Sequence, residues 1–427
     1  MERSLLTKFL YFPGLLLLSM MIVVPSAYQF FKGILFFIVF SEIFIIINFR
    51  LRLKMHPNIF FLFLFYIFLG LLFGIYGLVR QNSGALPITK EIVLYVVFYM
   101  IIICGIDDFT LLEYIHKTLV FSMLFLCIYL TASILNAYGI WPDWLYYSLQ
   151  TKTSDQAINT ATLKLYGRFS ASFSSYPSLL FLQPYLFTYL ITNQKKNSKW
   201  MWILFLIMTI IMVFVGRRIL LMVALSFPLF IIISINFIRK NHEHKVIKWK
   251  SVLFYLAIFF IILSIIFIEV SGISIKSIID YVVSNFQSKQ VTSGGKVGSN
   301  VRLDTIVQLF KGWKESPIFG FGSGAYYPKF IRNPLEPWNY EVSYMQYLYS
   351  WGILGCALYG IGIYFIINKL IKIYKENSIY SCYALSSLMG MVAFLVGNAT
   401  NPYLLKLDYF FVIFLPVAII NLHYRKH

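Results

Sequence analysis

Four arginines and one glutamate are the residues of this sequence whose types and positions could do chemistry. Arg217 and Arg218 form a whole turn between two apolar runs, Arg302 opens a helical pattern in a long polar segment, and Arg168 precedes another apolar run. Guanidinium groups bind phosphate oxygens bidentately, and a nearby membrane strengthens that contact. Glu341 closes the long polar segment and could act as a general base. Together they predict a site for a lipid-linked diphosphate.

Each of these residues also has a plainer interpretation. A single arginine could contact lipid head groups or neutralise a nearby carboxylate. Partial burial of Glu341 at the membrane edge would raise its pKa toward neutrality, whereas pairing with an arginine would make it a structural carboxylate. The sequence alone leaves both interpretations open. The other carboxylates on the same predicted side are Asp143, Asp155, Asp280, Asp304, Glu315 and Glu336.

The elements that must position these residues are apolar helices. The 427 residues are 59% hydrophobic and 12% charged, which is more apolar surface than a soluble core can bury. We therefore predict an all-α polytopic membrane protein. The net charge of +19 is split into small clusters between apolar runs, which argues against a nucleic-acid-binding domain. About twelve transmembrane helices are predicted, at 9–26, 30–48, 58–79, 91–106, 115–138, 176–193, 200–216, 218–237, 251–270, 343–367, 379–398 and 408–422.

The charge pattern assigns a side to each connection. Most loops after even-numbered spans are rich in Lys and Arg, so the positive-inside rule puts them and both termini in the cytoplasm. The first apolar run lacks a clear cleavage site, and we interpret it as a retained helix. Residues 1–427 then form a single integral membrane domain with two long outward segments, 139–175 and 271–342.

The larger outward segment, between spans 9 and 10, contains two predicted amphipathic helices that would rest at the membrane surface. The first has Ile275, Ile278, Ile279, Val282 and Phe286 at helical spacing, and the second has Leu303, Ile306, Val307, Phe310 and Trp313. Asn300 is a candidate N-cap of the second helix. A glycine run that includes Gly322 and Gly324 follows it and could bring backbone close to a phosphate.

Histidine is confined to one side of the predicted membrane. All six histidines lie in predicted cytoplasmic loops or span ends, so an outward zinc site of the usual histidine type is not expected. An outward general base would then have to be a carboxylate. We predict no metal and no cofactor.

Four local patterns resemble the superfamily of O-antigen ligases and O-antigen or capsule polysaccharide polymerases. These are bacterial membrane glycosyltransferases that act on undecaprenyl-diphosphate-linked sugars. The span count and the large periplasmic loop before the last three spans also match. The patterns are the segment from Arg168 to Pro177, the turn Gly216-Arg217-Arg218, Arg302 with the glycines after it, and the segment from Glu341 to Met345 followed by Gly352 and Gly355. Ligases carry a histidine where Glu341 stands, and this departure favours a polymerase.

The resemblance implies a surface polysaccharide polymerase of the cell inner membrane, as in lipopolysaccharide biosynthesis. It would join undecaprenyl-diphosphate-linked oligosaccharide repeat units on the outer face of the membrane. Catalytic residues would be Glu341, Arg302, Arg217 and Arg218, and substrate-binding residues would be Arg168, Gly322, Gly324 and Tyr344. A chain-length regulator and a flippase are implied partners. The alternatives are an O-antigen ligase and a lipid-linked oligosaccharide flippase or other transporter.

Overall fold

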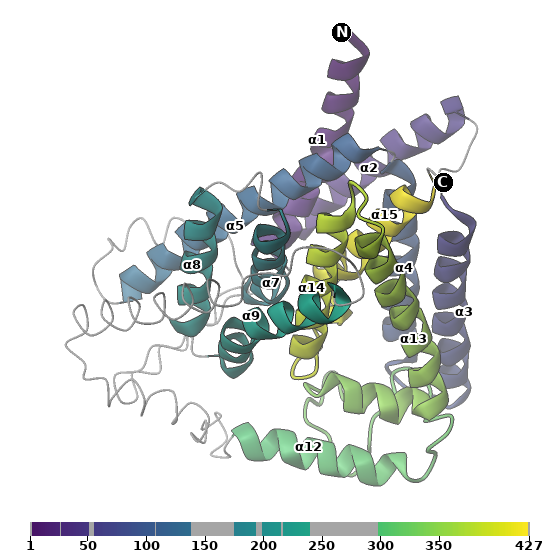
Figure 1. The fold of residues 1–427 in the computed structure, drawn as a ribbon. Coiled ribbons are helices and arrows are strands. Elements are labelled where there is room, and N and C mark those ends of the chain that lie inside the picture. Colours follow the sequence, from purple (N-terminus) through teal and green to yellow (C-terminus); the bar gives the residue numbers. More distant parts are fainter. Residues whose placement is uncertain are drawn as a thin grey trace, which may run out of the picture.

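The computed structural model of the chain is a bundle of helices (Figure 1). It describes residues 2–25, 27–50, 55–106, 108–137, 175–193, 199–214, 217–239 and 298–425. Its helices are α1 (Glu2–Val23), α2 (Gln29–Arg50), α3 (Pro57–Val79), α4 (Ala85–Gly105), α5 (Phe109–Ala137), α7 (Tyr176–Thr192), α8 (Lys199–Phe214), α9 (Arg218–Arg239), α12 (Gly298–Trp313), α13 (Ser343–Lys375), α14 (Ser381–Asn398) and α15 (Phe411–Arg425). Two short 3-10 helices, η1 (Tyr403–Leu405) and η2 (Leu407–Tyr409), lie between α14 and α15.

Apolar helices of membrane-spanning length make up much of this bundle. Among the described residues, six helical segments are long and apolar enough to cross a membrane: α3, α4, residues 109–132 of α5, residues 219–238 of α9, α13 and α14. Shorter apolar stretches lie in α1, α8 and α15. The chain is therefore a multi-pass helical membrane protein. The predicted span at 251–270 and the predicted amphipathic helix at 275–286 lie outside the described residues.

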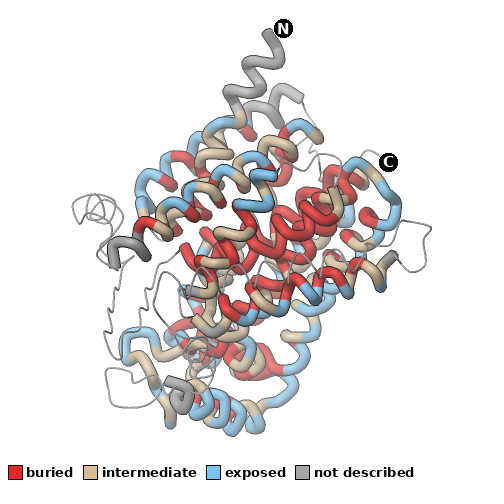
Figure 2. Tube along the Cα trace, turned by 60° about the vertical axis from the view of Figure 1, so that its left-hand side comes forward, coloured by how far each residue is buried: buried red, intermediate tan, exposed pale blue. Residues whose placement is uncertain are grey.

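The core of the bundle lies where α7, α14 and α15 meet. Nearly all residues of α7 are buried, and α14 and α15 are buried along most of their length. Figure 2 shows these buried residues at the centre of the bundle, with exposed residues along the outer helices. Because lipid solvates the apolar outer faces, the exposed Phe, Ile and Leu residues of α2 and α3 need no protein partner.

The end of the molecule away from both termini is a separate layer (Figure 1). It consists of α12, residues 314–342 and the first turns of α13. Helix α13 breaks at Gly352, which has φ 63° and ψ −172°. A Cβ atom at Gly352 would lie 2.2 Å from the carbonyl oxygen of Ile318, so only glycine fits this break.

Backbone hydrogen bonds from residues 317–322 stabilise the break in α13. The N–H groups of Ile353 and Leu354 donate to the carbonyl oxygens of Pro317 and Ile318, at 2.9 and 3.0 Å. The Gly322 N–H donates to the carbonyl of Ser350 at 2.7 Å. These bonds satisfy groups that a broken helix leaves unpaired. They fix residues 317–322 against the point where α13 turns into the bundle.

Candidate functional site

The inner face of α12 positions Arg302. Thr305, Leu309 and Gly312 lie on the same face as Arg302, at helical spacing, and all three are buried. Leu309 packs into a small core that contains Tyr327, Tyr340 and Tyr349. The predicted N-cap at Asn300 is wrong, because α12 begins at Gly298 and Asn300 lies inside it. The predicted apolar face with Leu303, Ile306, Val307 and Phe310 is exposed, and its place at a membrane surface stays a prediction.

Arg302 and Arg332 each form an ion pair with Glu341. The Arg302 Nε atom lies 3.0 Å from one carboxylate oxygen of Glu341, and an Arg332 terminal nitrogen lies 2.8 Å from the other. The three side chains are between 28% and 44% exposed, so the group is open to an incoming molecule. A second terminal nitrogen of Arg332, Nη1, is buried and has no hydrogen-bond partner within the described part of the chain. It therefore retains donor capacity.

The loop of residues 327–340 positions Arg332 beside Glu341. The Tyr340 hydroxyl accepts from the Tyr327 N–H at 3.1 Å and donates to the Phe330 carbonyl at 3.0 Å. Tyr340 is fully buried, so its two hydrogen bonds join the end of this loop to its beginning, at Tyr327 and Phe330, within the protein interior. Its burial raises its pKa.

The pKa of Glu341 follows one of the two interpretations that the sequence left open. Burial alone would raise it, but hydrogen bonds from Arg332 and Arg302 and the charges of both guanidiniums outweigh burial and lower the pKa. Glu341 is thus ionised and paired, as the alternative interpretation expected. Of the two interpretations, the structure favours the arginine-paired carboxylate over the one with a raised pKa.

Arg217 and Arg302 meet at Tyr403. Tyr403 lies in η1 and is partly buried, and burial raises its pKa. A side-chain hydrogen bond from Arg217, its charge and the charge of Arg302 oppose that shift. Because Arg302 also contacts Glu341, the guanidinium groups of Arg217, Arg302 and Arg332 are linked through Tyr403 and Glu341. We call Arg217, Arg302, Arg332, Glu341 and Tyr403 the arginine cluster.

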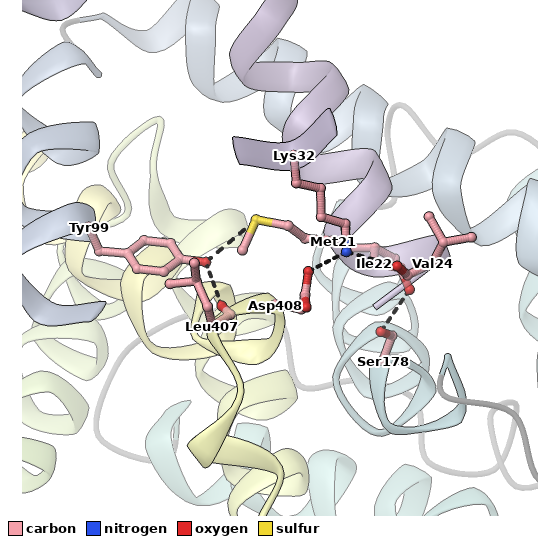
Figure 3. Close-up of polar contacts among 8 residues, drawn as sticks. All are labelled: Met21, Ile22, Val24, Lys32, Tyr99, Ser178, Leu407 and Asp408. Carbon is pink, nitrogen blue, oxygen red and sulfur yellow. Dashed lines mark hydrogen bonds and ion pairs between the residues drawn. The ribbon is translucent and has the colours of Figure 1, made fainter. Parts of the chain in front are cut away.

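The segment that carries Tyr403, residues 399–410, is fastened to the bundle by several polar contacts. Figure 3 shows the Lys32 ammonium donating to Asp408 at 2.6 Å and to the Val24 carbonyl at 2.8 Å. The Tyr99 hydroxyl donates to the Leu407 carbonyl at 3.3 Å. Lys32 and Asp408 are 2% and 6% exposed, so they form a buried ion pair. These contacts join α2 and α4 to the segment that holds Tyr403.

Tyr344 lies beside the same segment. Its hydroxyl donates to the Leu395 carbonyl of α14 at 2.5 Å. Near that point, the side-chain oxygen Oδ1 of Asn398 accepts from the Leu404 N–H of η1 at 3.0 Å. The predicted contact of Tyr344 with substrate stays a prediction.

Gly322 and Gly324 have a packing role. Both have positive φ, at 86° and 69°, and a Cβ atom on Gly324 would lie 1.9 Å from the carbonyl carbon of Gly84. They allow the loop to lie directly on the α3–α4 turn. The Gly322 amide already donates to Ser350, and the predicted contact of both glycines with phosphate stays a prediction.

The side chains of two of the predicted arginines are not described. Arg168 lies outside the described residues, and of Arg218 only the backbone, at the start of α9, is described.

Comparisons with protein-family models, with curated proteins and with solved structures find no match to this chain.

Sequence reasoning missed Arg332, Tyr403 and the Lys32–Asp408 pair. Lys32 stands in an apolar run, where a charged residue is a signal in itself, but its partner is 376 positions away. Arg332 was one of eight basic residues in segment 271–342, which can carry such charges freely. Nothing local distinguishes it from Lys329 on the same loop.

Proposed function

We propose that this protein is a surface polysaccharide polymerase, a membrane glycosyltransferase that uses an undecaprenyl-diphosphate-linked sugar as donor. One observation carries the proposal: Arg302 and Arg332 share one carboxylate, Glu341, at a half-open site, and Arg302 acts with Arg217 on Tyr403 beside it. Among the described residues, two guanidinium groups that share one carboxylate leave an excess of positive charge. A diphosphate supplies the missing negative charge and has enough oxygens to engage several guanidinium groups.

In the proposed reaction, a hydroxyl of the acceptor sugar attacks the anomeric carbon of the donor. A new carbon–oxygen bond forms, the bond from the anomeric carbon to the diphosphate oxygen breaks, and the diphosphate leaves with the electron pair. Guanidinium groups stabilise the negative charge that builds up on that oxygen. Arg302 and Arg332 would supply this stabilisation from α12 and the loop before α13, with Arg217 beside them.

Glu341 takes the acceptor proton in this proposal. In the empty site its pKa is held low by Arg302 and Arg332. When diphosphate oxygens accept the hydrogen bonds of these arginines, Glu341 keeps its partial burial but loses the two donors. Its pKa then rises, because burial disfavours the charged form. The base would be activated by donor binding.

The proposal extends to cellular context. We expect the protein in a bacterial inner membrane, with both termini in the cytoplasm and the arginine cluster on the outer face. The growing glycan would be transferred to another lipid-linked repeat unit, with a flippase supplying the units and a chain-length regulator acting on the product. The ligase alternative uses the same anion site but a different acceptor, and the transporter alternative binds the anion without chemistry.

A complementation experiment separates these functions. The gene is deleted, the strain receives Arg302→Ala or Glu341→Gln, and the surface glycan is run on a gel. Loss of polymerase activity leaves single repeats attached and no ladder, whereas loss of a ligase or flippase leaves no repeats attached. Lys329→Ala is the matched control, because Lys329 is an exposed cation on the loop that carries Arg332. A full ladder from both site variants would refute the proposed site.

A further inference from the structure

A cavity at the other end of the bundle lies outside the proposed catalytic site. It has a volume of about 140 Å³ and is lined by residues of α1, α2, α4, α5 and α15. Its lining includes Met21, Tyr99 and Phe414, as well as Gly14 and Glu42. Glu42 is the one carboxylate among the lining residues. All others except Tyr11, Tyr99 and Met21 are aliphatic residues, phenylalanine or glycine, which suits a hydrocarbon chain.

Glu42 has no partner within the described part of the chain. No hydrogen bond or ion pair involves it, and burial is the only influence on its charge state. A carboxylate facing an apolar cavity without a partner is costly in a membrane protein, and such residues usually serve a ligand or a transport path. Glu42 is therefore complementary to a ligand with a cationic or hydrogen-bond-donating head.

The depth of Glu42 indicates which part of a ligand it meets. The adjacent residue, Ile43, lies against Gly105, where a Cβ atom would be 2.9 Å from an Ile43 side-chain carbon. Gly105 is the last residue of α4, which is a candidate membrane span, so Glu42 lies near the end of that span. Head groups of lipids occupy this level, and their chains extend toward the bundle centre.

The arginine cluster is closed off from this cavity. At the Tyr99 side of the cavity, the Tyr99 hydroxyl contacts both Met21 and the Leu407 carbonyl, and the Lys32–Asp408 pair lies beside them (Figure 3). A lipid tail whose head lies at the arginine cluster would have to pass this barrier. The occupant therefore belongs to the leaflet on the side of the termini.

We propose that this cavity is a binding site for an amine-headed membrane phospholipid. One acyl chain lies between α1 and α4 and reaches Phe414. The ammonium group donates to the Glu42 carboxylate, which has no cationic partner among the side chains that the structure describes. The proposal is independent of the glycosyltransferase function.

A lipid-dependent unfolding experiment tests this site. The full-length protein is purified in detergent, and its thermal unfolding midpoint is measured with phosphatidylethanolamine or phosphatidylglycerol of identical acyl chains. We expect the ethanolamine lipid to raise the midpoint by about 2 °C or more above the glycerol lipid, as a ligand does that binds only the folded state. Glu42→Gln should abolish that difference.

Two further variants make the result specific. Glu315→Gln, which neutralises an exposed carboxylate in the layer at the far end, should keep the full difference. Gly14→Leu should reduce stabilisation by both lipids, because its side chain enters the cavity; the nearest side-chain atom to a Cβ there is 3.8 Å away, on Val39. If this variant does not fold, bound lipid is counted by native mass spectrometry in the wild type and Glu42→Gln. Equal effects of the two lipids on the wild type, or an unchanged preference in Glu42→Gln, would overturn the proposal.

Discussion

The molecule contains two groups of opposite charges that differ in balance and exposure. Lys32 and Asp408 form an ion pair that is almost completely buried. In the arginine cluster, Arg302 and Arg332 share one carboxylate, Glu341, among the described residues, and the side chains of these two ion pairs are about one-third exposed. A buried ion pair of one cation and one anion cannot be reached by a ligand, so it can act only on the stability of the fold. A solvent-exposed group with more cations than anions can bind a further anion. We infer that the first is structural and the second is functional.

The largest effect should come from breaking the buried pair on one side. Lys32→Met removes the ammonium group from a buried ion pair and leaves the Asp408 carboxylate in place, a change that typically costs about 3–5 kcal/mol of folding free energy. The double variant Lys32→Met/Asp408→Leu should recover most of that loss, because it removes the buried carboxylate as well. The measurement is the free energy of unfolding in detergent. A single variant as stable as the double variant would contradict the structural role of the pair.

A substitution in the arginine cluster should lower activity much more than it lowers stability, the opposite of the buried pair. Arg332→Ala should lower the rate of glycosyl transfer by about 100-fold, as loss of a group that stabilises transition-state charge does. Its effect on unfolding should stay within about 1 kcal/mol, because the ion pair with Glu341 is partly solvated. An in vitro transfer assay and an unfolding curve on the same preparation check both parts. A large loss of stability would remove the distinction between the two regions.

Tyr403→Phe should have a smaller effect, because it removes one hydrogen bond with Arg217 and keeps the ring. A net loss of about 1 kcal/mol corresponds to a rate reduction of about fivefold. Tyr95→Phe is the matched control, since its hydroxyl contacts the Leu405 carbonyl in the same segment, at 3.5 Å, but contacts no arginine. Equal losses in both variants would mean that Tyr403 acts only through the fold.

The smallest expected effect is the pH dependence of the stability that the Glu341 ion pairs provide. Because the folded-state pKa of Glu341 is lowered, its ion pairs stabilise the protein above the ordinary pKa of a glutamate, about 4.3. That stabilisation is lost as pH falls through the lowered value. The difference in unfolding midpoint between wild type and Glu341→Gln should thus be constant above about pH 5 and shrink below pH 4.3.

In Arg302→Ala/Arg332→Ala, burial is the main remaining influence on Glu341, and the change should move to higher pH. Repeating the midpoint comparison in this background, with and without Glu341→Gln, checks the shift. An unchanged pH dependence would mean that the arginines do not control this carboxylate.

The positions of the predicted spans could be read from the sequence because each forms an apolar run. Eleven of the twelve predicted spans coincide with helices, and the twelfth lies outside the described residues. The position of Arg217 and Arg302 on one side followed from alternation of the spans. The pairing of Lys32 with Asp408 and of Arg332 with Glu341 did not, since tertiary packing decides it. The direction of the Glu341 pKa shift was left open for the same reason: it depends on which donors reach the carboxylate.

The most direct test of the central claim is the binding of a diphosphate lipid. The affinity of purified protein for a short-chain polyprenyl diphosphate is measured for wild type, Arg302→Ala/Arg332→Ala and Lys32→Met/Asp408→Leu. We predict that the arginine variant binds at least about tenfold more weakly, which is 1.4 kcal/mol, and that the double variant of the buried pair binds as the wild type does. Equal affinity of the wild type and the arginine variant would contradict the account.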